Sequence, residues 1–112
     1  MKRLLSALFF VLSLGIYAPS HAGYFVDGNQ LLENLNTDAR QAARFYAYVS
    51  AIVDALDGKG LPEIGCFRVP QAATVGQVAD SVKAYLEKNP RYRHMNASYL
   101  VVTALVIDDP CK

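Results

Sequence analysis

The C-terminal third of the chain, residues 74–111, reads TVGQVADSVKAYLEKNPRYRHMNASYLVVTALVIDDPC, and the expected architecture depends mainly on this segment. Thr74 followed by Gln77 is a capping-box pattern, in which each side chain satisfies a backbone N–H group at the start of a helix. Asn89-Pro90 ends the pattern, because the residue before a proline is pushed away from the α conformation. Between these signals the apolar residues share one helical stripe, and the opposite side is polar. That stripe consists of Val75, Val78, Ala79, Val82, Tyr85 and Leu86.

The second half of this segment, residues 97–107, has almost no polar side, since only Ser98 and Thr103 interrupt its apolar residues. A helix that is apolar all round must be buried on most sides. About 11 residues cover roughly 16 Å as a helix, whereas a membrane span needs about 20 residues. We therefore expect a core element or a dimer-interface element. The β-branched residues leave a buried strand open as an alternative to a helix.

Residues 1–22 have the pattern of a secretory signal peptide. Lys2 and Arg3 supply the charged start, residues 4–16 supply the apolar run, and Ser20-His21-Ala22 offers small residues at the two positions that a signal peptidase inspects. A short membrane anchor is the alternative, although the apolar run is short for one. We expect cleavage near Ala22, which leaves a single helical domain at residues 23–112.

The expected mature chain carries almost no net charge. Lys2 and Arg3 leave with the signal, so 9 Lys and Arg residues remain against 10 Asp and Glu residues, a formal charge of −1. A near-neutral chain gives no electrostatic case for binding nucleic acid or anionic lipid. Its length of about 90 residues fits one domain with one modest core.

Two cysteines, Cys66 and Cys111, remain after cleavage. Because an exported chain meets an oxidising compartment, we expect one disulfide between them. It would close a loop of about 45 residues, for which the chain-entropy model gives about 4 kcal/mol. A redox or nucleophilic thiol is the alternative, and it is disfavoured because the chain has no CxxC motif.

Two further helical patterns lie before Cys66. A short one follows Asp27, and a longer one, capped by Thr37 or Asp38, ends near Gly58, which can close a helix in a left-handed conformation. The short pattern carries Leu31, Leu32 and Leu35, and the apolar face of the longer one carries Ala42, Phe45, Tyr46, Val49, Ile52, Val53 and Leu56. A ridge of small residues on its other side would let another helix come close, from this chain or from a second copy; it consists of Ala47, Ala51 and Ala55. We therefore predict an all-α fold, a small bundle of about four helices stapled by the Cys66–Cys111 disulfide.

Motifs for catalysis, cofactors and metals are missing from the sequence. The mature chain has one histidine, His94, so a histidine-rich zinc site is not expected. It contains no GxSxG motif and no glycine-rich phosphate loop. Asp108 and Asp109 are interpreted as a solvated helix end rather than an acid/base pair. We therefore expect no enzyme, no cofactor and no metal, and Asp54 could be either exposed or buried.

Two segments have binding character. The elbow, residues 88–94, places three cations, an imidazole and a tyrosine in seven residues, and arginine and tyrosine are favoured interface anchors. A solvated turn is the alternative interpretation. The loop from Gly58 to Gly65 is a second candidate, because loops on a rigid scaffold often carry function. The candidate partner-binding residues are Arg91, Tyr92, Arg93 and His94 in the elbow, and Lys59 and Glu63 in the loop.

Several motifs resemble the Rap/Tai family of immunity proteins. They are GNQLL at residues 28–32, YVSAIVDAL at 48–56, CFRVP at 66–70, and the segment from TVGQ to the final PC. Members of this family are small helical periplasmic proteins that neutralise antibacterial effectors of type VI secretion systems, often cell-wall amidases. The resemblance implies periplasmic location, a cognate effector whose active site is occluded, and a homodimer.

The chain departs from the family at one pair of positions, since many members carry two further cysteines where Leu35 and Phe45 stand here. Our hypothesis is that a hydrophobic contact replaces that bridge. The alternative function is a small periplasmic acid-stress chaperone with one disulfide. Such chaperones tend to carry charged flexible tails. The expected mature chain has few residues before Asp27 or after Cys111 that could form such a tail.

Overall fold

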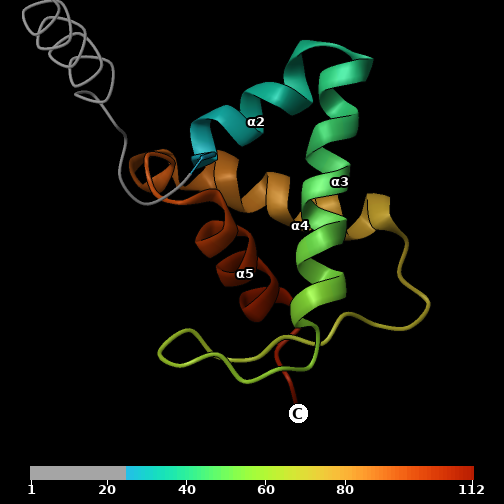
Figure 1. Ribbon diagram of the computed structural model, residues 1–112. Coiled ribbons are helices and arrows are strands. Elements are labelled where there is room, and N and C mark those ends of the chain that lie inside the picture. Colours follow the sequence, from blue (N-terminus) through green and yellow to red (C-terminus); the bar gives the residue numbers. More distant parts are fainter. Residues whose placement is uncertain (1–24) are drawn as a thin grey trace, which may run out of the picture.

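The computed structural model describes residues 25–112, and the expected signal peptide lies outside this part of the chain. Four α-helices are present there, together with one short 3-10 helix. They are α2 (Gly28–Thr37), α3 (Ala39–Leu56), α4 (Val75–Lys88), the 3-10 helix η1 (Pro90–Tyr92) and α5 (Ala97–Asp108). Within residues 25–112 there is no β-strand, only isolated bridges. The predicted all-α bundle is confirmed (Figure 1).

Aspartate side chains start both N-terminal helices. The Asp27 carboxylate accepts a hydrogen bond from the Gln30 N–H at 2.8 Å, and Asp38 accepts one from the Gln41 N–H at 2.8 Å. Each bond satisfies a donor that the first helical turn leaves unpaired. Of the two caps expected for α3, the structure therefore uses Asp38, and Thr37 is the last residue of α2.

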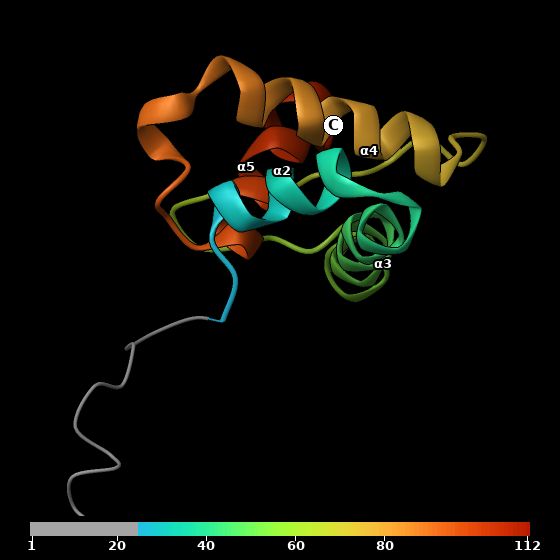
Figure 2. The same cartoon turned by 90° about the horizontal axis from the view of Figure 1, so that it is seen from above.

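The capping box at the start of α4 is formed as predicted. The Gln77 N–H donates to the Thr74 hydroxyl at 3.2 Å, and the Thr74 N–H donates to the Gln77 side-chain oxygen at 2.9 Å. At its other end α4 stops at Lys88, and the Asn89 amide donates back to the Tyr85 carbonyl at 2.8 Å. Figure 2 shows α4 and α2 side by side, with α3 viewed nearly end-on.

The core forms around α5, which is a helix rather than the alternative strand. Six of its twelve residues are buried, and α2, α3 and α4 all pack against it. They are Ala97, Leu100, Val101, Val102, Ala104 and Leu105. The largest buried side chains from elsewhere in the chain are Phe45, Phe67, Leu31 and Leu86. The absence of a continuous polar side on α5 is thus explained largely by this position (Figure 1).

Two residues of the predicted apolar helix stripes are exposed. Val75 lies at the first turn of α4, beyond the edge of the core, and is 49% exposed. Tyr46 is 38% exposed, and its ring packs edge-on against Phe45 at a centroid distance of 5.9 Å. A tyrosine at the edge of an apolar stripe can bury its ring partly and leave its hydroxyl in water.

The positions of the missing family cysteines are occupied by core residues. Phe45 is fully buried, and Leu35 packs against the same core from α2. Apolar side chains therefore fill both positions, as the hypothesis of a hydrophobic replacement requires.

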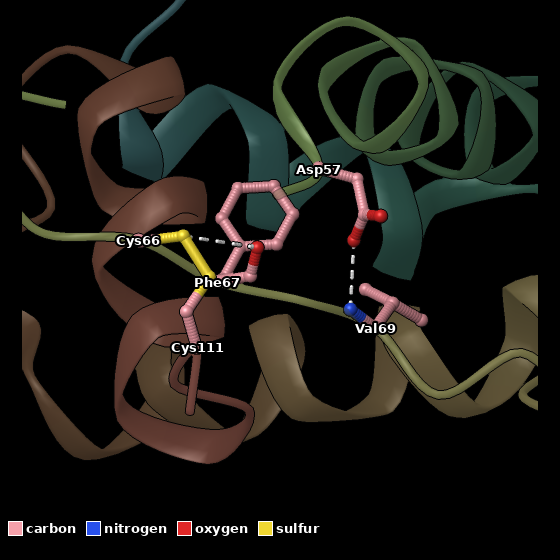
Figure 3. The surroundings of a disulfide bond; sticks show 5 residues. All are labelled: Asp57, Cys66, Phe67, Val69 and Cys111. Carbon is pink, nitrogen blue, oxygen red and sulfur yellow. Dashed lines mark hydrogen bonds between the residues drawn. A yellow bond between two sulfur atoms is a disulfide. The ribbon is translucent and has the colours of Figure 1, made fainter. Parts of the chain in front are cut away.

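The loop between α3 and α4 is held at several points. Gly58 has the predicted left-handed conformation, with φ of 77°, and Asp57 accepts a hydrogen bond from the Val69 N–H at 2.7 Å. The predicted disulfide joins Cys66 to Cys111, with a Cα–Cα distance of 5.4 Å. Figure 3 shows the disulfide and the Asp57–Val69 bond close together, so the loop is fixed against the ends of both α3 and α5.

Candidate partner-binding surfaces

Arg91 and Tyr92 belong to the short 3-10 helix η1 in the elbow. Pro90 begins the 3-10 helix, and the Tyr92 N–H donates to the Asn89 carbonyl at 3.1 Å. Tyr92 is 42% exposed, and the Arg91 guanidinium carbon lies 5.9 Å from the centroid of its ring, within cation–π range. Both side chains are available to a partner, and their backbone is already ordered.

The backbone of Arg93 supports the start of α2. Its carbonyl accepts a hydrogen bond from the Asn29 N–H at 2.9 Å, and the Met95 carbonyl accepts one from the Gly28 N–H at 3.1 Å. The elbow therefore satisfies the first N–H groups of α2. The Nε atom of Arg93 is buried with no hydrogen-bond acceptor among the described residues. Arg93 is half-buried, whereas Arg91, Tyr92 and His94 are exposed.

A Cβ atom on Gly28 would not fit beside this backbone. It would lie 2.5 Å from Cδ1 of Leu100, 2.9 Å from the Arg93 carbonyl oxygen and 3.0 Å from the Arg93 Cα. The first helix, the elbow and the start of α5 therefore meet at one close contact. The Asp27–Asn96 backbone bridge lies at the same junction.

Lys59 and Glu63 belong to a compact loop after α3. The Leu61 N–H donates to the Gly65 carbonyl at 2.8 Å, and the Gly65 N–H donates back to Leu61 at 2.9 Å, which closes a tight turn. Glu63 lies at the tip of this turn with φ of 67°, a conformation that few side-chain-bearing residues adopt. Both Lys59 and Glu63 are exposed.

The six predicted residues do not form one cluster, because α5 separates the two segments. The elbow precedes the first residue of α5, and the loop is joined through Cys66 to Cys111, just beyond its last residue. Twelve helical residues span about 18 Å. Any partner that contacts both segments must therefore cover the length of α5.

A groove of about 750 Å³ opens beside the disulfide, and the sequence did not indicate it. It is lined by Asp57, Arg68, Val69, Pro70, Gln71, Asp108, Asp109, Pro110 and Lys112. These residues come from three separate segments, which the disulfide and the Arg68 N–H bond to the Asp109 carbonyl at 2.8 Å bring together. The expected Cys66–Cys111 pairing was the one available signal for this groove.

A smaller hollow of about 130 Å³ lies between α4 and α5. Its lining consists of Ser81, Ala84, Tyr85, Lys88, Asn89, Ala104, Ile107 and Asp108. Burial raises the pKa of Tyr85, and the nearby Tyr99 and Tyr92 raise it further. Of these three tyrosines, Tyr85 alone lines the hollow.

Within residues 25–112, no three His, Cys, Asp or Glu side chains are grouped so that they could hold a metal ion. His94 and the carboxylates of Asp108 and Asp109 lie at opposite ends of α5. In the same described part of the chain, no helix is both long and apolar enough to cross a membrane. Asp54 is exposed on α3.

Comparison with known proteins gives one family. The sequence model of the Rap1a immunity proteins matches residues 27–111, which covers every helix described above. No curated protein matches the chain.

Proposed function

The chain belongs to the Rap1a immunity protein family, and on that premise we propose that it binds a cognate antibacterial effector and covers the active site of that effector. The effector would be delivered by a type VI secretion system and would be a peptidoglycan amidase. Neutralisation of this kind requires tight binding and no chemistry, so the chain acts as an inhibitor and not as an enzyme. No cofactor or metal is needed.

We place the contact surface at the elbow chiefly because Arg91 and Tyr92 are exposed there. Tyrosine and arginine side chains supply much of the binding energy where they are desolvated at the centre of an interface. Here the 3-10 helix fixes the backbone of both residues, and the Arg91 guanidinium lies 5.9 Å from the centroid of the Tyr92 ring. Preorganisation lowers the entropic cost of association. Arg93 and His94 follow them in the sequence and belong to the same proposed contact, and Lys59 and Glu63 form a second, smaller contact.

Export to the periplasm is part of the same proposal. We infer that residues 1–22 are a signal peptide cleaved near Ala22, and that residues 23–112 act in the periplasm as one domain. The Cys66–Cys111 disulfide fits an oxidising compartment of this kind. We also propose that the mature chain forms a homodimer and is not bound to the membrane.

Co-expression tests the proposal. The neighbouring gene product is exported to the periplasm alone and together with this chain, and lysis and co-purification are scored together. We expect lysis by the neighbour alone, and rescue with co-purification when both are present. A neighbour that lyses cells but is neither bound nor neutralised would contradict the proposal. A neighbour that is harmless would lead to acid-dependent holdase assays, which test the chaperone alternative.

A matched pair of variants tests the surface. The double variant Arg91→Ala, Tyr92→Ala should abolish rescue, because it removes both of these exposed side chains of the elbow. Arg40→Ala removes one exposed arginine from α3 and should rescue as well as the wild type. Full rescue by the double variant would move the effector contact away from the elbow.

A further inference from the structure

The loop after α3 contains a residue in a backbone conformation that side-chain-bearing residues rarely adopt. Glu63 has φ of 67°, and no other residue except glycine has a positive φ within residues 25–112. It occupies the third position of a turn in which Pro62 is second and the Ile64 N–H donates to the Leu61 carbonyl at 3.2 Å. This is the pattern of a type II turn, whose third position is normally glycine or asparagine. A glutamate at this position is therefore held at a conformational cost.

The base of this turn is fixed against the rest of the chain. Leu61 and Ile64 pack against the core, and backbone hydrogen bonds of 2.8 and 2.9 Å close the turn between Leu61 and Gly65. A Cβ atom on Gly65 would lie 3.1 Å from Cγ1 of Val106, so the turn lies directly on α5. The disulfide begins at the next residue. The surroundings therefore impose the conformation of Glu63, as a strained residue requires.

The tip of the turn, which consists of Pro62 and Glu63, faces solvent. Both residues are exposed, although Leu61 and Ile64 on either side are partly buried. The Glu63 carboxylate forms no ion pair or hydrogen bond with the part of the chain that the structure describes. In Figure 1 the loop that follows α3 lies below α5, on the side away from α2. The fold thus holds a carboxylate on a rigid protrusion.

The combination of strain and exposure indicates a role in binding. Strained residues cluster at ligand clamps and functional sites, where the surrounding structure holds them in place. Glycine at position 63 would relieve the backbone, but it would remove the carboxylate. The side chain of Glu63 is therefore what the turn presents. Because the turn is ordered before binding, association costs less conformational entropy.

The chemistry of the tip defines the site that it can enter. A carboxylate that leaves water must meet a cation or several N–H donors, because an unpaired buried charge is strongly unfavourable. Enzymes that hydrolyse amide bonds place such donors in the active-site cleft, where they stabilise the negative charge that develops on the carbonyl oxygen. A protruding carboxylate is complementary to a cleft of this kind in shape and in charge.

We propose that the tip enters the active-site cleft of the effector, and that the Glu63 carboxylate binds the N–H donors or the cation of that cleft. The inference rests on the proposed function and adds to it the segment that occludes the site. The elbow lies at the other end of α5, about 18 Å away. It would bind the surface beside the cleft. Occlusion and additional affinity are thus assigned to opposite ends of one helix.

Titration calorimetry of the processed chain with the purified neighbouring gene product tests this proposal. Glu63→Gly removes the carboxylate and relieves the backbone, whereas Glu63→Gln removes only the charge. We expect both variants to bind about 30-fold more weakly or worse, the usual result when one partner of a buried charge pair is removed. Glu33→Gln makes the same change at an exposed glutamate of α2 and should bind as the wild type does.

Thermal denaturation of the same variants separates binding from folding. Glu63→Gly should melt about 4 °C above the wild type, because glycine adopts a positive φ without strain. Glu63→Gln should melt at the wild-type temperature, since it keeps the same backbone cost. A variant that is more stable and yet binds more weakly would not arise if Glu63 served only to hold the loop. Circular dichroism confirms that each variant is folded.

Three outcomes would overturn the proposal. If the wild-type chain binds the neighbouring gene product and both Glu63 variants bind equally well, the tip lies outside the interface and only this inference fails. If Glu63→Gly at saturating concentration still blocks peptidoglycan hydrolysis completely, another segment occludes the site. If the wild-type chain does not bind at all, the proposed function fails together with the inference.

Discussion

The two ends of α5 are held in different ways. At its N-terminal end, the helix meets the elbow and the start of α2 through backbone hydrogen bonds and the close contact at Gly28. At its C-terminal end, the helix is followed closely by Cys111, which is bonded to Cys66 in the loop. The first end is fixed by local geometry and needs no particular environment. The second end also has backbone hydrogen bonds, such as that from the Arg68 N–H to the Asp109 carbonyl at 2.8 Å, but part of its support depends on the oxidation state of two sulfur atoms.

This difference separates the two candidate segments. The elbow with Arg91 and Tyr92 belongs to the non-covalent end, and the loop with Lys59 and Glu63 belongs to the disulfide end. Reduction should therefore loosen the loop and the charged groove before it disturbs the elbow. Four predictions test the comparison, beginning with the largest expected effect.

Removal of the disulfide by Cys66→Ala with Cys111→Ala should lower the free energy of unfolding by about 4 kcal/mol, because the unfolded chain regains the freedom of a loop of 45 residues. Urea denaturation measures the change, and reduction of the wild type should reproduce it. A loss below about 1 kcal/mol would show that the C-terminal end of α5 is held chiefly by other contacts.

Gly28→Ala should cost about 2 kcal/mol at the other end, because the new Cβ would lie 2.9 Å from the Arg93 carbonyl oxygen and the elbow would have to move. Gly60→Ala is a matched control, since no atom lies within 4 Å of the position that its Cβ would take. Thermal denaturation compares the two variants. Equal stabilities would mean that the junction of α2, the elbow and α5 is looser than described.

Asn96→Ala should cost about 1 kcal/mol, because the Asn96 side chain accepts a hydrogen bond from the Ser98 N–H at 3.0 Å and caps α5. Asn96→Asp keeps an oxygen acceptor at this position and should retain most of the stability. The same denaturation experiment measures both variants. If the alanine variant were no less stable than the aspartate variant, the cap would contribute nothing to holding the elbow end.

The smallest expected effect is on stability at alkaline pH. It involves Tyr48, which packs next to Ser98 at the elbow end of α5. Burial raises the pKa of Tyr48, and its hydrogen bonds with Ser98 lower it by less. The folded-state pKa of Tyr48 lies above the ordinary value of about 10, so folding favours the neutral phenol. The stability that comes from this preference is present below about pH 10 and is lost as pH rises through the folded-state pKa. Melting temperatures above pH 10 should therefore fall less steeply for Tyr48→Phe than for the wild type. An identical slope would contradict this effect.

Much of the fold follows from local signals in the sequence. The capping box at Thr74, the stop at Asn89-Pro90 and the turn at Gly58 were each predicted, because each depends on neighbouring residues alone. The exposure of Val75 and Tyr46 was not predicted, since the helical period gives the direction of a side chain but not the extent of the core. The structural role of Arg93 depends on α2, more than 60 residues earlier in the chain, and no local pattern could have indicated it.

The candidate surfaces were predicted less completely for the same reason. Composition identified the elbow, whose residues are adjacent in the sequence. The groove beside the disulfide combines Asp57, Arg68 and Lys112, which only the folded chain brings together. Residues 97–107 were recognisable as a segment without a polar side, but the sequence could not indicate which of them the core would bury.

Inhibition of the purified neighbouring gene product is the most direct test of the proposed function. The measurement is hydrolysis of peptidoglycan by that protein while the oxidised, processed chain is added in increasing amounts. Hydrolysis should fall to background once the two proteins are equimolar, and it should persist with the double variant Arg91→Ala, Tyr92→Ala. Undiminished hydrolysis in the presence of excess wild-type chain would contradict neutralisation by occlusion of the active site.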